Sequence, residues 1–223
     1  LHELDFISAK YKLARDMKAV KPHVSKQKRI DVLDAVHPLL KRKNQGENKP
    51  TFGQNIQMDE SRRMLVISGP NAGGKSITLK TLGLFQLMVQ SGMFIPAKEN
   101  NTFCLFSQIY SEIGDNQSIE NELSTYSYRL TRMKKFLALS NPETLLLLDE
   151  FGTGSDPDLG GALAEAFFES LYRKKIFAIL TTHYSNIKSR AVQLPQAVNG
   201  CMLFNPINLQ PLFRFEMGSP GSS

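Results

Sequence analysis

The feature that most constrains the fold is a run of apolar residues that leads directly into a glycine-rich loop. Residues Met64–Ser68 read MLVIS, and GPNAGGKS follows at positions 69–76. This loop fits the pattern G-x-x-x-x-G-K-[ST], in which glycines allow a tight turn and bring backbone N–H groups close to phosphate oxygens. A mostly apolar helical stretch begins near Lys75, so the positive N-terminal end of that helix would face the same anion.

The loop predicts a binding site for nucleotide phosphates. Lys75 would reach the outer phosphates, and the Ser76 hydroxyl would be a ligand of Mg²⁺. An ordinary glycine turn with a surface lysine is the weaker interpretation, because the loop joins an apolar strand to a helix. We expect nucleotide contacts from Gly69, Pro70, Asn71, Ala72, Gly73, Gly74, Lys75, Ser76 and Ile77.

Two further apolar runs predict the rest of a sheet. They are Thr144–Leu148 (TLLLL) and residues 176–182 (IFAILTT), and their nearly continuous apolar character is typical of strands covered on both faces. Helical patterns lie between the runs, at about 75–91, 124–139 and 159–174. Strands that alternate with helices predict an α/β fold with a largely parallel sheet flanked by helices. Residues 198–217 favour an antiparallel hairpin at the edge of this sheet.

Two carboxylates follow the second run directly. Asp149 and Glu150 come after TLLLL, and a carboxylate at the carboxyl end of a parallel strand points into the crevice where ligands bind. We expect Asp149 to hold Mg²⁺, directly or through water, and Glu150 to orient and polarise the attacking water. A solvated pair at a strand end is the alternative, and the phosphate loop upstream favours the catalytic interpretation.

The third run ends in Thr181, Thr182 and His183. His183 would lie beside the outermost phosphate, where a side chain that switches between donor and acceptor could sense that phosphate. A structural histidine with satisfied hydrogen bonds is the alternative. Lys75, Glu150 and His183 are therefore the expected catalytic residues.

Composition excludes several classes of protein. The chain has 223 residues, is 41% hydrophobic and carries a net charge of +6, which permits binding to phosphate backbones without showing it. Its two cysteines, Cys104 and Cys201, match no metal-site spacing and are expected to be reduced thiols. No uncharged apolar run reaches the roughly 20 residues of a membrane span, and charges throughout residues 1–20 argue against a signal peptide. We expect a cytoplasmic protein without a membrane partner.

The first fifty residues predict an appendage and connecting segments. Residues 1–18 carry apolar side chains at three- and four-residue steps, which predicts a helix with one apolar stripe. Residues 21–28 are basic and contain Pro22, so they resemble a connector. KRKNQGENKP at 41–50 is typical of a polar loop.

Several segments together resemble the ATPase domain of the MutS family. They are GPNAGGKS at 69–76, FIPA at 94–97, LLLLDEFGTGSD at 145–156 and TTHY at 181–184, with HPLL at 37–40 before them. Within that family, three segments resemble the type-two, recombination-suppressing bacterial branch and not the mismatch-recognising branch. These are NQSIENELSTYS at 116–127, THYSNIKSRA at 182–191 and the terminal GSPGSS.

The resemblance implies an ABC-like phosphate-loop NTPase with ATP and Mg²⁺ as its ligands. Two such domains would form a homodimer in which Ser124 of one subunit completes the other site, and Asp156 would also contact across the dimer. Phe52 would pack on the adenine. Residues 1–24 would be the end of a lever-arm helix with its connector, and residues 25–223 the ATPase domain. The dimerisation helices and any nuclease module of the family would lie outside this chain.

Three functions remain open from the sequence. The first is the ATPase of a MutS-type DNA-binding protein in mismatch repair or recombination control, which contacts DNA through regions absent from this chain. The second is the motor of a type-two protein that acts on collided ribosomes. The third is a transporter-type ABC ATPase, which the absence of an LSGGQ-like signature disfavours, since the nearest counterpart is LSTYS at 123–127. Nucleotide binding without hydrolysis is disfavoured by the presence of Glu150.

Overall fold

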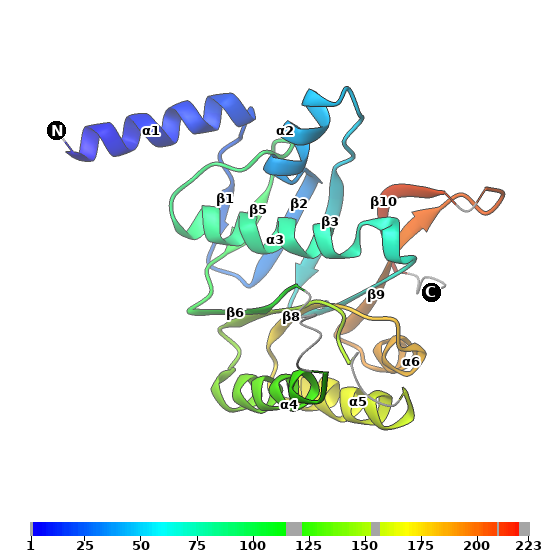
Figure 1. Ribbon diagram of the computed structural model, residues 1–223. Helices are drawn as coiled ribbons and strands as arrows, with labels where there is room; N and C mark the ends of the chain where they lie inside the picture. The colour runs from blue at the N-terminus through cyan, green and yellow to red at the C-terminus, as the bar shows by residue number, and fades with distance from the viewer. Residues whose placement is uncertain (1, 115–121, 153–156, 209, 219–223) are drawn as a thin grey trace.

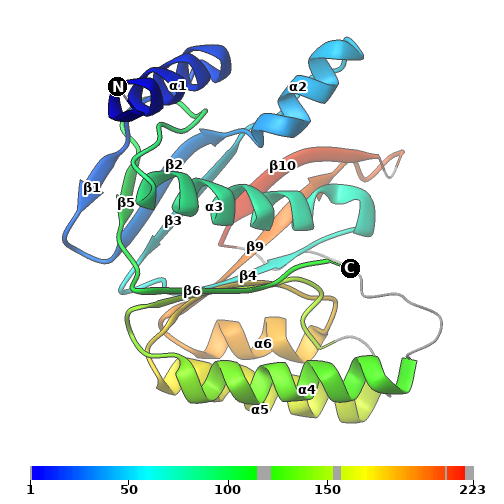
Figure 2. The same ribbon diagram turned by 60° about the vertical axis from the view of Figure 1, so that its left-hand side comes forward.

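Two β-sheets with one long helix between them form the framework of the protein (Figure 1). The computed structural model describes residues 2–114, 122–152, 157–208 and 210–218. The helix between the sheets is α3 (Lys75–Gln90). Helices α4 (Glu122–Leu139), α5 (Pro157–Arg173) and α6 (Ser185–Gln193) form a layer on the far face of the larger sheet (Figure 2).

The larger sheet has six strands and holds the strand before the phosphate loop near its middle. All neighbouring strands are parallel except the final pair, β9 and β10, which is antiparallel. In spatial order the strands are β10 (Pro211–Met217), β9 (Ala197–Phe204), β4 (Met64–Ser68), β8 (Phe177–Thr181), β7 (Thr144–Leu148) and β6 (Gln108–Glu112).

The central strands β4, β7 and β8 are buried at every position and mostly apolar, because both of their faces are covered. In β4, Leu65 and Ile67 belong to the core that contains α3, whereas Met64 and Val66 belong to the core against α5 and α6. Side chains alternate between the two faces of a strand, so a strand between two helical layers needs a continuous apolar run. The loop after β4 is thereby anchored between two hydrophobic cores.

The smaller sheet packs on the other side of α3 and was not expected from the sequence. Two of its strands, β1 and β5, have only three residues each, too few for a periodic pattern. β3 alternates buried and exposed residues, with Gln54, Ile56 and Met58 buried, and the polar Gln54 on its buried face obscures the apolar alternation. In spatial order the strands are β1 (His23–Ser25), β5 (Thr102–Cys104), β2 (Arg29–Ala35) and β3 (Gln54–Asp59).

Two exposed helices precede the phosphate loop. α1 (His2–Met17) and α2 (Pro38–Gly46) have no buried residue. The expected polar loop at 41–50 is wrong up to Gly46, because α2 starts at Pro38, a favoured first residue of a helix, and continues through the polar residues on its exposed side. The expected connector at 21–28 contains β1. Among the described helices none has the length and apolar character needed to span a membrane.

The main predicted elements are present in the structure. The strands Met64–Ser68 and Thr144–Leu148 have the expected bounds, and β8 is one residue shorter at each end than the expected 176–182. The predicted hairpin at 198–217 is formed by β9 and β10. The expectation of an α/β fold is confirmed, and the two sheets are mixed.

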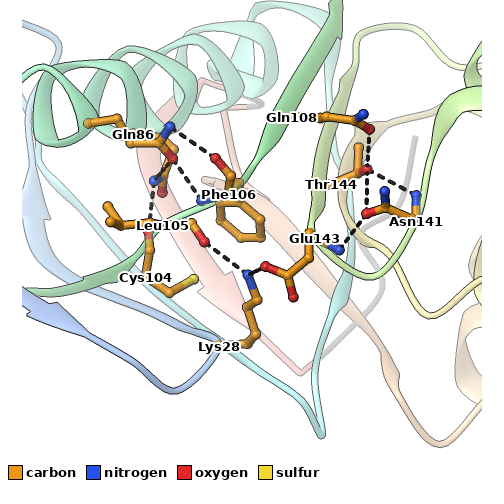
Figure 3. Close-up of polar contacts among 10 residues, drawn as sticks. Lys28, Gln86, Cys104, Leu105, Phe106, Gln108, Asn141, Glu143 and Thr144 are labelled. Atoms are coloured by element: carbon orange, nitrogen blue, oxygen red, sulfur yellow. Dashed lines mark hydrogen bonds and ion pairs between the residues drawn. The ribbon is translucent and has the colours of Figure 1, made fainter.

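Side-chain amides of α3 continue the backbone pairing where the chain leaves β5 (Figure 3). The Gln86 side chain donates to Cys104 O at 2.8 Å and to Gln90 Oε1 at 2.9 Å. The Gln90 amide accepts from Phe106 N–H at 2.9 Å and donates to Phe106 O at 3.1 Å. A buried backbone group without a hydrogen-bond partner is costly. These two glutamines therefore stabilise residues 104–106, the segment that leads from the smaller sheet to β6.

Lys28 connects residues 105 and 106 of this segment to the larger sheet (Figure 3). Its ammonium donates to Leu105 O at 2.9 Å, pairs with Glu143 just before β7 and lies 4.9 Å from the centre of the Phe106 ring. The two sheets are therefore joined by polar contacts as well as by the core around α3.

Candidate active site

The glycine-rich loop adopts backbone conformations that require glycine. Gly69 has φ +124° and Gly74 has φ +101°, in the region that L side chains rarely adopt. A Cβ atom added at Gly69 would also lie 3.0 Å from Met202 O on the neighbouring strand β9. The short helix η1 (Asn71–Gly73) lies between these glycines, and α3 begins directly after Gly74. The loop thus wraps around the positive N-terminal end of α3.

Lys75 lies within this loop and is almost completely buried, with 4% of its surface exposed. Its ammonium donates to Gly69 O at 2.7 Å and to Pro70 O at 3.1 Å. Burial lowers the pKa of Lys75, whereas the carboxylates of Glu150 and Asp149 act to raise it. The lysine therefore lies near both carboxylates expected to act at the site.

Three strand ends bring the polar residues together. Strand β8 lies between β4 and β7, so Thr181 at its end lies between the residues that follow its two neighbours. The Thr181 hydroxyl donates to Asp149 Oδ1 at 2.6 Å, and the Ser76 hydroxyl donates to the same oxygen at 3.0 Å. The two residues expected to bind Mg²⁺ are therefore in direct contact.

The backbone turns sharply at Glu150. This residue has φ +49°, an unusual value for a side chain other than glycine or asparagine. Its N–H donates to the Thr181 hydroxyl at 2.8 Å, and the next N–H, of Phe151, donates to Thr181 O at 2.7 Å. Such conformations persist only where surrounding contacts enforce them. Thr181 thus positions the Asp149 carboxylate and the backbone at Glu150, a role that the motif at 181–183 was not expected to have.

His183 lies at the same end of β8. Burial lowers its pKa from 6.5, and the cations Lys75 and Lys188 lower it further, while Glu150 opposes them. The imidazole is therefore neutral near pH 7, with one nitrogen donating and the other accepting. His183 follows β8, which lies between the strand before the phosphate loop and the strand before Glu150, so it belongs to the same edge of the sheet.

An apolar pocket of about 320 Å³ opens beside the loop. The rings of Phe52 and Phe213 line it and are nearly parallel, at an angle of 11° with centroids 6.4 Å apart. The pocket also contacts Gly74 and Ile77 of the phosphate loop and helix. Phe52 was expected here. Phe213 was missed, because nothing in the sequence of the hairpin places it next to residues near position 52.

Two expected residues are not described at the level of their side chains. Ser124 lies in the first turn of α4, which begins two residues earlier, at Glu122, and its side chain is outside the described part of the structure. Asp156 lies outside the described residues altogether. Both remain predictions, as do the side-chain contacts of Asn71.

The residues present fit a nucleotide with Mg²⁺. Mg²⁺ prefers oxygen ligands such as a hydroxyl and a carboxylate, and the Ser76 and Asp149 oxygens lie 3.0 Å apart. A buried lysine and a helix N-terminus lie beside them, as an anionic group would require. The arrangement can bind phosphate, hold a divalent cation and place a carboxylate, Glu150, next to both.

Comparison with known proteins identifies the family of the chain. The family described as MutS domain V matches residues 65–218. The protein named Endonuclease MutS2 of Lactobacillus acidophilus is 42% identical over 223 residues, which is 100% of this chain and 28% of the relative. Its namesake in Lactiplantibacillus plantarum is 41% identical, with the same coverage. That of Clostridium acetobutylicum is 40% identical over 221 residues, or 99% of this chain and 27% of the relative. The chain spans little more than a quarter of the length of these relatives.

Proposed function

The chain belongs to the MutS domain V family, and from that premise we propose that it is the ATP-binding and ATP-hydrolysing part of a MutS-type DNA-binding protein. The observation that carries the proposal is the contact of Ser76 and Thr181 with Asp149, beside the buried Lys75 and the glycine-rich loop. Together they form an ABC-like phosphate-loop site with ATP and Mg²⁺ as its ligands.

In this proposal the loop binds the phosphates. Backbone N–H groups of Gly69 and of residues 71–77, together with the N-terminus of α3, face the phosphate oxygens, and Lys75 neutralises their charge. The pocket of Phe52 and Phe213 takes the adenine, because a planar base stacks well on aromatic rings and the pocket adjoins the loop.

Ser76 and Asp149 would hold Mg²⁺, which when bound supplies positive charge that stabilises the transferring phosphoryl group. Thr181 keeps the Asp149 carboxylate oriented toward Ser76. Glu150, which follows Asp149 in a left-handed backbone conformation, accepts a proton from the attacking water. His183, neutral near pH 7, offers a hydrogen bond to the outermost phosphate.

The wider assembly is part of the same proposal. Two ATPase domains pair, and Ser124 and Asp156 of one subunit face the nucleotide of the other. Residues 1–24 are the end of a lever arm and residues 25–223 the ATPase domain, and DNA is held by other parts of the longer protein. The relatives are named endonucleases, and we assign nucleotide hydrolysis, not strand cleavage, to the portion that this chain represents.

Steady-state hydrolysis of Mg²⁺-ATP, measured against protein concentration, tests the proposal. The wild-type chain is compared with Glu150→Gln, Ser124→Ala and the control Glu143→Gln, which changes a surface carboxylate paired with Lys28. We expect activity per molecule to rise with concentration, Glu150→Gln and Ser124→Ala to abolish it, and Glu143→Gln to retain it.

Each outcome addresses a different part of the proposal. A wild-type chain that binds ATP but hydrolyses none at any concentration would contradict the assignment of hydrolysis to this chain. Activity that is independent of concentration and insensitive to Ser124→Ala would contradict the paired site alone. Activity that survives Glu150→Gln would remove the proposed base.

A further inference from the structure

The rings that line the base pocket are not held by packing alone. Phe52 is 37% exposed and Phe213 is 44% exposed, so much of each ring faces solvent. They also come from different sheets, since Phe52 precedes β3 of the smaller sheet and Phe213 lies in β10 of the larger one. Some other contact must set their nearly parallel arrangement.

The hairpin is irregular at the place where Phe213 lies. Pro211 pairs with Phe204 and Phe215 with Met202, so four steps along β10 match only two along β9. Phe213 lies inside this bulge with φ +52°. A bulge leaves backbone groups without partners in the ladder and redirects the local side chain. Here the redirected side chain is the ring that lines the pocket.

The side chain of Gln54 bonds the backbone at this bulge. Its amide nitrogen donates to Phe213 O at 2.8 Å and to Phe52 O at 3.2 Å, and its oxygen accepts from Phe215 N–H at 2.7 Å. A carbonyl only accepts and an N–H only donates, so only one orientation of the amide satisfies all three groups. Both N–H donors of Gln54 are used in these contacts.

Gln54 is itself firmly anchored. It is 7% exposed and pairs with Ala35 in the smaller sheet. The preceding Gly53 packs so closely against Asp34 that an added Cβ would lie 2.7 Å from the Asp34 carbonyl carbon. The amide is therefore a rigid bridge between the smaller sheet and the bulge of β10.

From these contacts we infer that Gln54 is a positioning residue that sets how much the base contributes to nucleotide binding, by holding the rings of Phe52 and Phe213 in the nearly parallel arrangement that lines the base pocket. The inference rests on the proposed function and concerns the same pocket. Gln54 acts through the two rings, because its side-chain hydrogen bonds go to the backbone at Phe52, Phe213 and Phe215 and not to the phosphate loop.

Binding of two ligands separates this role from a general structural one. Dissociation constants are measured for ATP and for inorganic triphosphate, which has no base, with the wild-type chain, Gln54→Met and Gln57→Met. Methionine keeps the length of glutamine but removes its hydrogen bonds. Gln57 is the matched control because it lies on the exposed face of the same strand.

We expect Gln54→Met to weaken ATP binding about five- to tenfold, as loss of well-placed hydrogen bonds does, and to change triphosphate binding less than about twofold. Gln57→Met should change neither. In a chain that already carries Phe213→Ala, Gln54→Met should weaken ATP binding by less than it does alone, because both changes act through one ring. Circular dichroism and the unfolding temperature establish that each variant is folded.

The inference fails if Gln54→Met binds ATP as the wild type does, or if it loses ATP and triphosphate equally. Should Gln54→Met not fold, Gln54→Glu takes its place, since a carboxylate can still accept from Phe215 N–H but cannot donate to Phe213 O. A selective loss of ATP binding in that variant supports the inference, and a uniform loss or none overturns it. A wild-type chain that binds neither ligand would instead overturn the proposed function itself.

Discussion

At the scale of single residues, Asp149 and Glu150 are held in place by one hydroxyl group. Thr181 donates to the Asp149 carboxylate and accepts from the Glu150 N–H, so it joins the expected metal ligand to the expected base. It can do so because β8 lies between β4 and β7. The Thr181 hydroxyl, which has no proposed role in hydrolysis itself, thereby determines the position of the Asp149 carboxylate and of the Glu150 backbone.

Thr181→Val keeps the shape of the side chain but removes both hydrogen bonds. We expect hydrolysis of Mg²⁺-ATP to fall about tenfold or more, since one hydrogen bond to a charged group contributes about 1.5–3 kcal/mol. ATP binding measured with EDTA should be nearly unchanged. Thr131→Val, on the exposed side of α4, is the control and should be as active as the wild type. Equal activity of both variants would exclude this role of Thr181.

Two histidines make stability depend on pH. Burial lowers the pKa of His37 and of His183 from 6.5, and nearby lysines lower both further. As the pH falls below 6.5, the unfolded chain takes up protons that the folded chain does not, so the free energy of unfolding decreases. Above that pH this contribution is fully retained.

Urea unfolding at pH 7.5, 6.5 and 5.5 measures this effect. We expect the free energy of unfolding to fall between pH 6.5 and 5.5, and to fall less steeply when both His37→Gln and His183→Gln are present. An identical slope in the double variant would assign the pH dependence to other groups.

At the scale of elements, the hairpin β9–β10 contributes to both the phosphate loop and the base pocket. Met202 on β9 packs against Gly69 and Gly73, and Phe213 on β10 lines the pocket. The two strands approach closely at Gly200, where an added Cβ would lie 2.2 Å from Cζ of the buried Phe215 ring and 3.1 Å from Glu216 O. The position of β10 therefore depends on the absence of a side chain at Gly200.

Gly200→Ala tests this close approach. We expect a loss of about 1–3 kcal/mol in the free energy of unfolding, because the buried Phe215 ring would have to move to admit the new Cβ. Gly46→Ala is the control, since an added Cβ there meets nothing within 4 Å, and it should be neutral or stabilise the helix by up to about 1 kcal/mol. Urea unfolding measures both variants, and only Gly200→Ala should lower the free energy of unfolding. Equal changes in this free energy would contradict the packing argument.

At the scale of the whole molecule, the two sheets share one core. Ile56 of the smaller sheet, Phe85 of α3 and Leu145 of the larger sheet belong to a single buried cluster. The base pocket likewise takes residues from both sheets, such as Gln54 and Met202. Folding of either sheet is thus coupled to the other and to the nucleotide site.

Nucleotide should consequently stabilise the entire chain in one step. We expect a single thermal transition that moves to higher temperature with ATP, by about 2.7 kcal/mol of added stability at a hundred times the dissociation constant. Differential scanning calorimetry with and without ATP measures it. Two transitions of which only one shifts would show that the sheets unfold independently.

The sequence by itself determined those strands and turns whose conformation depends on residues that are adjacent in the chain. The apolar runs at 64–68 and 144–148 predicted buried strands with correct bounds, because a strand covered on both faces must be apolar at consecutive positions. The glycine-rich loop was recognisable because its turn needs glycine at Gly69 and Gly74, whatever surrounds it. The positions of Asp149, Glu150 and His183 just after buried strands were also predicted, and the structure has them after β7 and β8, whereas their roles stay predictions.

The tertiary structure alone decided the contacts between distant residues. Gln54 and Phe213 are 159 positions apart, and no local pattern links them. Thr181 reaches Asp149 only because the strand order places β8 beside β7, an order that pairing between strands decides. The smaller sheet was missed for the same reason: β1 and β5 have only three residues each, and the sheet is formed by pairing between segments that lie far apart in the chain and by packing on α3.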